Sequence, residues 1–221
     1  MSFQREWEER FKNGEQASKW PWSDLVTLVM RYCRPFAENC AILELGIGTG
    51  ANIPFFLSLP VTYFGIDGSA ESIRMNRERF PKVAANLSAG DFTTELPANG
   101  PFHVIIDRAS LTCNSETSIR SCIRQVKQKL APGGIFVGVD WYSTENTYYT
   151  QGSQPGPDQF TRTKFATGPF QNLGTIHFSD AENIKDLFSD FELLHLEHKM
   201  NKSFIPIDES FAAWNFVARL R

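Results

Sequence analysis

The stretch AILELGIGTG, residues 41–50, places three glycines at alternate positions directly after an apolar run. The apolar run has the composition of a buried strand, and residues 51–58, ANIPFFLS, are expected to begin a helix. Gly46, Gly48 and Gly50 therefore lie where a strand turns into a helix, and their missing side chains let a ligand reach backbone N–H groups at the helix N-terminus. An ordinary turn needs one or two glycines, so the pattern favours a ligand site.

The same alternation of apolar strand, loop and amphipathic helix continues along the chain. Helices are expected to start after Ser69 and Ser115, because a serine side chain suits the N-cap position. Strands are predicted over residues 41–46, 62–67, 104–107, 134–140, 191–200 and 211–220. The first four end in Gly or Asp and alternate with helices, which predicts a mostly parallel sheet; the last two follow each other and predict an antiparallel pair at its edge.

Two acids at strand ends narrow the choice of ligand. Glu44 precedes the first glycine by two residues, and its carboxylate would repel a pyrophosphate but attract a cationic amino acid moiety and a sulfonium. Asp67 ends the next strand, where an acid can accept hydrogen bonds from both ribose hydroxyls of a nucleoside. A dinucleotide is the alternative, because Ala51 can stand in for the third glycine of the dinucleotide-binding pattern.

The motifs ILELGIGTGANI, GIDGS, AGDF, FHVIIDRASLTC and VKQKLAPGGIFVGVDW follow one another over about residues 40–142. In order and spacing they resemble class I S-adenosylmethionine-dependent methyltransferases, and DRASLTC with the aromatic N-terminus is similar to a bacterial small-molecule subgroup. The resemblance implies a Rossmann-like α/β fold with a mostly parallel seven-stranded sheet, helices on both faces and a C-terminal antiparallel hairpin. It also implies S-adenosyl-L-methionine as the cofactor and S-adenosyl-L-homocysteine as its product.

The resemblance further assigns roles by position. The glycine turn would face the amino acid part of the methyl donor, and Asp67 would hold the ribose. Asp91 and Phe92, in AGDF, would surround the adenine, and Asp107 would face the methionine end of the donor.

Candidate residues on the acceptor side come from three parts of the chain. Arg108 and Ser110 directly follow the strand predicted over residues 104–107, where open α/β sheets place ligands, although loop hydrogen bonding explains them equally well. Trp20 is expected in an N-terminal cover over the cofactor. His177 is the histidine best placed to act as a general base, and a packed structural histidine is the alternative.

The 221 residues are expected to form one methyltransferase domain, 1–221. Within it the sequence indicates an N-terminal helical cover (1–36), a cofactor-binding core (37–140), an insertion or lid (141–176) and a C-terminal helix with a β-hairpin (177–221). The insertion is polar and Gly- and Pro-rich but carries many aromatic residues, which suits a segment that closes over a ligand.

Composition excludes several other classes. A formal net charge of −3 without a basic stripe argues against a nucleic-acid partner. No cluster of Asp and Asn follows the strand predicted over residues 104–107, so no metal is expected. No apolar run approaches the roughly 18 residues of a membrane span. The N-terminus is charged and aromatic, and the cysteines form no C-x-x-C pair and no metal-ligand pattern, so the sequence predicts a cytoplasmic protein. A monomer or homodimer is expected.

The favoured function is therefore methyl transfer to an oxygen or nitrogen of a small-molecule acceptor, such as a sugar or another metabolite. A methyltransferase-like binding protein without turnover is an alternative, because no base is identified by the sequence. Methylation of a protein or RNA is a further alternative, in which the hairpin or the insertion would present the docking surface.

Overall fold

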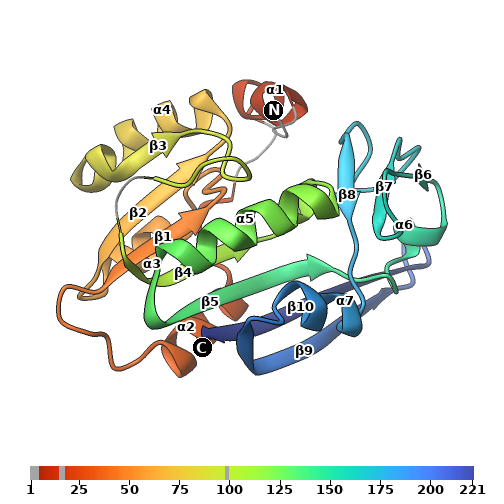
Figure 1. Ribbon diagram of the computed structural model, residues 1–221. Helices are drawn as coiled ribbons and strands as arrows, with labels where there is room; N and C mark the ends of the chain where they lie inside the picture. The colour runs from red at the N-terminus through yellow and green to blue at the C-terminus, as the bar shows by residue number, and fades with distance from the viewer. Residues whose placement is uncertain (1–4, 15–17, 98–99) are drawn as a thin grey trace.

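The computed structural model describes residues 5–14, 18–97 and 100–221, and its central element is a seven-stranded sheet (Figure 1). In spatial order its strands are β3 (Leu87–Ala89), β2 (Thr62–Asp67), β1 (Ala41–Leu45), β4 (Phe102–Arg108), β5 (Leu130–Tyr142), β10 (Glu209–Leu220) and β9 (Phe191–Ser203). The first five pair in parallel, whereas β10 is antiparallel to both β5 and β9. The predicted fold class is confirmed.

Helices cover both faces of this sheet because side chains of a strand point alternately to its two sides. On β1, Leu43 and Leu45 belong to one buried cluster and Ile42 to the other. The helical segments are α1 (Arg5–Lys12), α2 (Ser23–Tyr32), α3 (Ile53–Leu57), α4 (Ala70–Arg79), η1 (Pro81–Asn86), η2 (Leu111–Cys113), α5 (Glu116–Lys129), α6 (Thr147–Thr150) and α7 (Ala181–Leu187). Helices α5 and α7 contribute to the first cluster, and α2, α3 and α4 to the second.

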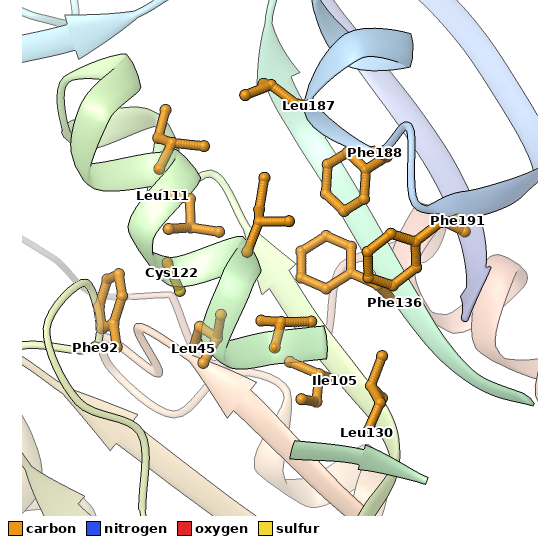
Figure 2. Close-up of a cluster of buried hydrophobic side chains, with 14 of the residues drawn as sticks. Leu45, Phe92, Ile105, Leu111, Cys122, Leu130, Phe136, Leu187, Phe188 and Phe191 are labelled. Carbon is orange, nitrogen blue, oxygen red and sulfur yellow. The ribbon is translucent and has the colours of Figure 1, made fainter. Parts of the chain in front are cut away.

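The cluster beneath α5 and α7 is rich in aromatic rings (Figure 2). Phe136 of β5 lies between the strand layer and α7, with its ring centroid 5.0 Å from that of Phe188. Phe188 in turn packs against Phe191 at the start of β9. These contacts join the C-terminal hairpin to the parallel part of the sheet, so the hairpin belongs to the same core.

Local signals account for the starts of the two main crossover helices. Ser69 Oγ accepts a hydrogen bond from the Ser72 amide (3.0 Å), and Ser115 Oγ accepts one from the Ser118 amide (3.4 Å). Both serines thus cap helix N-termini that would otherwise leave N–H groups without partners. The two caps fix where α4 and α5 begin, and so they limit the loops that connect β2 to α4 and β4 to α5.

The insertion is more regular than a loop. It contains α6 and a small antiparallel sheet in the order β6 (Gln154–Pro155), β7 (Thr161–Thr163) and β8 (Thr175–His177). Tyr148, Phe165 and Phe170 are buried in a third apolar cluster there, together with Phe178. In Figure 1 this unit stands at the end of the sheet toward which β5 runs.

The N-terminal helix α1 packs beside α4, where Ser69 Oγ donates a hydrogen bond to Glu8 Oε2. In the described ranges, none of the helices has the length and apolar character needed to cross a bilayer.

Candidate functional site

A cavity of about 280 Å³ lies at the carboxyl ends of the central parallel strands. Its floor comes from the strand ends and the loops that follow them, its sides from the N-terminal segment and the insertion. The lining residues include Trp7, Arg10, Phe11, Trp22, Glu44, Gly46, Gly48, Asn52, Asp67, Asp91, Phe92, Arg108, Ser110, Cys113, Tyr142, Phe170 and Leu173. The N-terminal segment and the insertion also contact each other, because Arg10 Nη2 donates a hydrogen bond to the Gln171 carbonyl (2.9 Å).

The glycine turn shapes the floor of the cavity. Gly46, Gly48 and Gly50 all have positive φ angles, of 66°, 53° and 71°, which favour glycine. A Cβ atom on Gly46 would lie 2.1 Å from Ser110 Oγ, and one on Gly50 would lie 2.0 Å from Asn76 Oδ1. The turn therefore packs tightly against two neighbouring segments. Gly46 and Gly48 line the cavity, whereas Gly50 shapes the turn from outside the lining set.

The expectation that these glycines offer free N–H groups to a ligand is wrong. The Gly46 amide donates to the Ile66 carbonyl (2.8 Å), the Gly48 amide to Asp67 Oδ2 (2.8 Å), and the Gly50 amide to the Ile47 carbonyl (2.9 Å). The helix after the turn, α3, is only five residues long. What the glycines provide is close approach of the backbone rather than hydrogen-bond donors.

Glu44 presents a buried carboxylate at the end of β1. Asn52 Nδ2 donates to its Oε1 (2.8 Å) and the Tyr63 hydroxyl to its Oε2 (2.7 Å), so the side chain is held in one orientation. Burial raises the pKa of Glu44 to about 7, although both hydrogen bonds and the nearby Arg108 act in the opposite direction. A cation bound beside Glu44 would favour its ionised form.

Asp67 ends β2, the strand beside β1, and lines the same cavity as Glu44. Its two oxygens accept hydrogen bonds from the amides of Gly48 and Ser69, both at 2.8 Å. Burial raises the pKa of Asp67 to about 6. Each carboxylate oxygen has a second lone pair, so the orientation that these amides fix still leaves capacity for two hydroxyl donors from the cavity.

Asp91 and Phe92 follow β3 and line the cavity, and the Phe92 ring lies near Gly46 at the edge of the apolar cluster beneath α5. Asp91 Oδ1 accepts hydrogen bonds from the Thr93 amide (3.0 Å) and hydroxyl (2.6 Å), which fix the loop. Phe92 is 9% exposed and presents an apolar ring there.

Asp107 does not reach the cavity, contrary to the role that the resemblance gave it. Its carboxylate is fully buried and accepts hydrogen bonds from the Leu111 amide (2.9 Å) and from Trp141 Nε1 (2.7 Å). Burial raises the pKa of Asp107 to about 7. The carboxylate thus fixes the loop after β4 and the end of β5 from beneath, so Asp107 positions Arg108 and Ser110 rather than a ligand.

Arg108 and Ser110 both line the cavity. The guanidinium of Arg108 lies 3.6 Å from the centroid of the Trp22 ring and donates two hydrogen bonds to Asp140 Oδ2 (2.8 and 3.0 Å). Ser110 Oγ donates to the Gly46 carbonyl (3.1 Å). Trp22 thus occupies the place expected for Trp20, which is 82% exposed and outside the lining set.

A second hollow, of about 320 Å³, adjoins the first and shares Trp22, Arg108 and Phe211 with it. Asp24, Asp140 and Lys199 bring further charge into this hollow. Lys199 is paired with Asp24, and its Nζ lies 4.0 Å from Asp140 Oδ1. The second hollow is therefore polar, with acidic and basic groups in equal number around it.

His177 lies outside the cavity, so its position does not support the role of general base. The side chain is completely buried on β8, and its Nε2 is 3.1 Å from Asn183 Oδ1. Burial lowers its pKa. Its neighbours are Glu116 and Asp158, and one potential ligand atom from each of these three residues lies within 4.8 Å of the others.

Several residues that line or support the cavity carry no local sequence signal. Asn52 and Tyr63 orient Glu44 but read in the sequence as helix-start and strand residues. Arg10 reads as one of many exposed charges on α1. Cys113 also lines the cavity; burial raises the pKa of its thiol to about 12, which keeps it protonated.

Comparison with known proteins identifies the frame of this cavity. Residues 42–134 match the family described as a methyltransferase domain. No curated protein sequence matches the chain. Among solved structures, an S-adenosylmethionine-dependent methyltransferase from Methanosarcina mazei has a TM-score of 0.69 at 15% identity, covering 91% of this chain and 98% of that one.

Two further structures agree with this match. A S-adenosylmethionine-dependent methyltransferase from Clostridium acetobutylicum has a TM-score of 0.64 at 15% identity, with 96% of this chain and 95% of that chain covered. An amino pentose methyltransferase from Micromonospora echinaspora, with S-adenosylmethionine bound and involved in calicheamicin biosynthesis, has a TM-score of 0.60 at 19% identity over 100% and 98% of the two chains. At these identities the likeness establishes the fold, and the family match covers the glycine turn and both strand-end acids.

Proposed function

We propose that the chain transfers a methyl group to an oxygen or nitrogen of a small-molecule acceptor, because it has the fold of class I S-adenosylmethionine-dependent methyltransferases and residues 42–134 match a methyltransferase domain. One observation carries this proposal. The carboxylates of Glu44 and Asp67 stand at adjacent strand ends in one cavity, with the glycine turn between them. Two buried acids beside a glycine turn, whose backbone a ligand can approach closely, suit a cationic nucleoside.

The proposed donor residues are Glu44, Gly46, Gly48, Asp67, Asp91 and Phe92, with Gly50 shaping the turn. Glu44 would balance the positive charge of the donor, and a cation beside it would counter the burial that raises its pKa. Asp67 would accept hydrogen bonds from the ribose hydroxyls, and the Phe92 ring would pack on the adenine. The assignments of Glu44 and Asp67 use side-chain orientations that the hydrogen bonds described above already fix.

S-adenosylmethionine supplies a sulfonium-activated methyl group, which an acceptor lone pair attacks in line while the carbon–sulfur bond breaks. The protein's contribution is then to hold the acceptor close and aligned and to exclude water. Phe11 of α1 and Phe170 of the insertion give the cavity apolar walls. No described histidine lines the cavity, so the proposed chemistry depends on positioning, and the acceptor's proton passes to water or to a polar group of the second hollow.

The acceptor would bind where the two hollows meet, against Arg108 and Trp22. The balanced acidic and basic groups there suit a neutral or zwitterionic acceptor with hydroxyl or amino groups, such as a sugar or another polar metabolite. The amino pentose methyltransferase similar in fold acts on an acceptor of this chemical kind. Enclosure by the N-terminal segment and the insertion favours a small molecule over a macromolecule.

The test is calorimetric titration with S-adenosylmethionine and S-adenosylhomocysteine, followed by transfer of radiolabelled methyl groups to fractionated metabolites. We expect stoichiometric binding of both nucleosides and label in a polar metabolite fraction. Absence of nucleoside binding would refute the proposal. Binding with no transfer to metabolites, proteins or RNA would indicate the non-catalytic alternative, and label only in macromolecules would indicate a different acceptor class.

A further inference from the structure

Three potential metal ligands meet where the insertion contacts the methyltransferase core. Glu116 is the first residue of α5, Asp158 lies in the insertion between β6 and β7, and His177 ends β8. One oxygen from each acid and one ring nitrogen lie within 4.8 Å of one another. Glu116 and Asp158 are half-buried, and His177 is completely buried. None of the three lines the donor cavity.

The imidazole of His177 carries the decisive feature. Its Nε2 is paired with Asn183 Oδ1 (3.1 Å). The backbone amide of Asn183 in turn donates a hydrogen bond to Asp180 Oδ1 (2.7 Å). With an acceptor oxygen at Nε2, the ring proton belongs on that nitrogen and Nδ1 keeps its lone pair. Nδ1 is buried and finds no hydrogen-bond partner among the described residues. An unpartnered ring nitrogen is unfavourable in a buried side chain that groups with two carboxylates, unless a cation or a proton supplies the missing partner.

The two carboxylates are oriented by the protein. Asp158 Oδ2 accepts hydrogen bonds from the Glu116 amide (3.0 Å) and the Thr161 hydroxyl (2.7 Å), and its Oδ1 accepts one from the Phe160 amide (3.1 Å). Glu116 Oε1 accepts two from Arg120 (2.6 and 2.8 Å). Those bonds leave each acid with acceptor capacity. Arg120 is shared between Glu116 and Asp186, so its single positive charge does not balance these two acids and Asp158 together.

We propose that His177, Asp158 and Glu116 bind a divalent transition-metal ion, with zinc as the preferred occupant. One imidazole with two carboxylates is a nitrogen and oxygen set that suits zinc, whereas calcium and magnesium favour sites made of oxygen alone. The Nε2 contact with Asn183 is the outer hydrogen bond that a metal-binding histidine normally makes. This site departs from the sequence-based expectation of no metal: Glu116 begins the helix after β4, and its two partners come from residues 158 and 177, which are distant in the sequence.

The ion would join three segments that are distant in sequence. Asp158 belongs to the insertion, Glu116 to the start of α5, and His177 to the last strand of the small sheet. The loop before α5 contributes Asn114 to the cavity, and the insertion contributes Phe170 and Leu173. The bound metal therefore stabilises the wall of the cavity from behind and takes no part in the reaction.

The test uses the full chain, freed of metal with a chelator and titrated with zinc alone by calorimetry. Cobalt absorption spectra would report the ligand geometry. We expect one zinc per chain and a higher unfolding temperature with zinc, because the ion binds only the folded state. Glu116→Gln and Asp158→Asn keep the size of each side chain and should weaken zinc binding by at least the roughly 10- to 100-fold that outer partners are worth.

Two control variants, His195→Gln and Glu182→Gln, change a histidine and an acid outside the cluster and should leave zinc affinity unchanged. Circular dichroism checks that each variant folds. Absence of zinc binding by the wild type, or equal affinity in the cluster variants and the controls, would overturn the proposal. A protonated His177 in place of the metal would appear as unfolding temperatures that depend on pH but not on zinc. Zinc titration needs no methyl donor, so this test stands or fails independently of the proposed function.

Discussion

Gly46 is the point at which the turn after β1 comes closest to the loop after β4. A Cβ there would lie 2.1 Å from Ser110 Oγ and 2.3 Å from Ser110 Cβ, whereas a Cβ on Gly48 would meet only Phe11 Cζ at 3.8 Å. Both glycines have positive φ, so alanine at either position carries a backbone strain of about 1–2 kcal/mol. Only Gly46→Ala adds overpacking, of about 1–3 kcal/mol.

Gly46→Ala should therefore lower the free energy of unfolding clearly more than Gly48→Ala does. Urea unfolding of the two variants and the wild type, followed by circular dichroism, measures the difference. Equal losses would mean that the contact with Ser110 does not constrain the turn.

Asp67 gives the sharpest prediction for the donor site. Asp67→Ala removes charge-assisted hydrogen bonds to the ribose and should weaken S-adenosylmethionine binding by about 10- to 1,000-fold, as measured by calorimetry. Because alanine also leaves the Gly48 and Ser69 amides without their acceptor, Asp67→Asn serves as a second variant that keeps an acceptor oxygen. Glu78→Gln, on α4 with a side chain that is 67% exposed, is the control. Unchanged donor affinity in both Asp67 variants would remove Asp67 from the site.

Sequence reasoning could place Glu44 and Asp67 because both acids directly end recognisable apolar strands. Asp107 ends a strand in the same manner, yet its carboxylate turns inward to Trp141, 34 residues further along the chain. No local sequence pattern predicts that Trp141 will be the hydrogen-bond partner of Asp107. Trp20 and Trp22 are likewise indistinguishable in the sequence, and only the packing of Trp22 under Arg108 separates them.

At the scale of elements, predictions were accurate where the signal is local. β2 spans the predicted residues 62–67, and Ser69 and Ser115 cap the helices expected to follow them. The strands β6, β7 and β8 were not predicted, because they have two or three residues each and form only through pairing with one another. A periodicity cannot be recognised in so short a run.

The insertion has its own apolar cluster and presents Phe170 and Leu173 to the cavity. Replacing residues 152–172 by a short Gly-Ser linker should lower turnover by about 100-fold or more, because the acceptor loses its wall and its alignment. Donor affinity should change far less, since Glu44, Asp67 and the glycine turn remain. Radiolabel transfer and calorimetry on the same preparation separate the two effects. Wild-type turnover by the shortened enzyme would rule out a lid.

Phe170→Ala is the milder version of that experiment. Phe170 packs against Tyr142, Tyr148, Phe165 and Phe178, with ring centroids 4.8–5.8 Å away. Truncating it should cost about 3–5 kcal/mol of stability and raise the KM for the acceptor. Phe160→Ala, in the same insertion but outside the cavity lining, is the matched control for the KM.

At the scale of the whole molecule, the sheet brings three acidic side chains together at the carboxyl ends of its strands, at the border of the two apolar clusters. The strand ends carry Glu44, Asp67 and Asp107, and burial raises the pKa of all three carboxyls. In the ligand-free fold, the stability that protonated Glu44 provides is fully present below its ordinary pKa of 4.5 and is lost as pH rises through about 7. The molecule thus holds a negative charge at neutral pH that a bound cation would stabilise.

This arrangement makes donor binding depend on pH with a definite sign. S-adenosylmethionine carries a sulfonium, so binding beside Glu44 favours the carboxylate and releases a proton wherever the free side chain is protonated. Since the pKa of Glu44 is raised to about 7, affinity should increase by up to about tenfold per pH unit below that value and level off above it. Calorimetry between about pH 5.5 and about pH 7.5, in buffers of different ionisation enthalpy, measures both the affinity and the number of protons released. Glu44→Gln should bind the donor more weakly at neutral pH and lose the part of the slope between about pH 6 and about pH 7, keeping only the part below it that Asp67 contributes. A slope in Glu44→Gln equal to that of the wild type would show that Glu44 does not face the donor's charge.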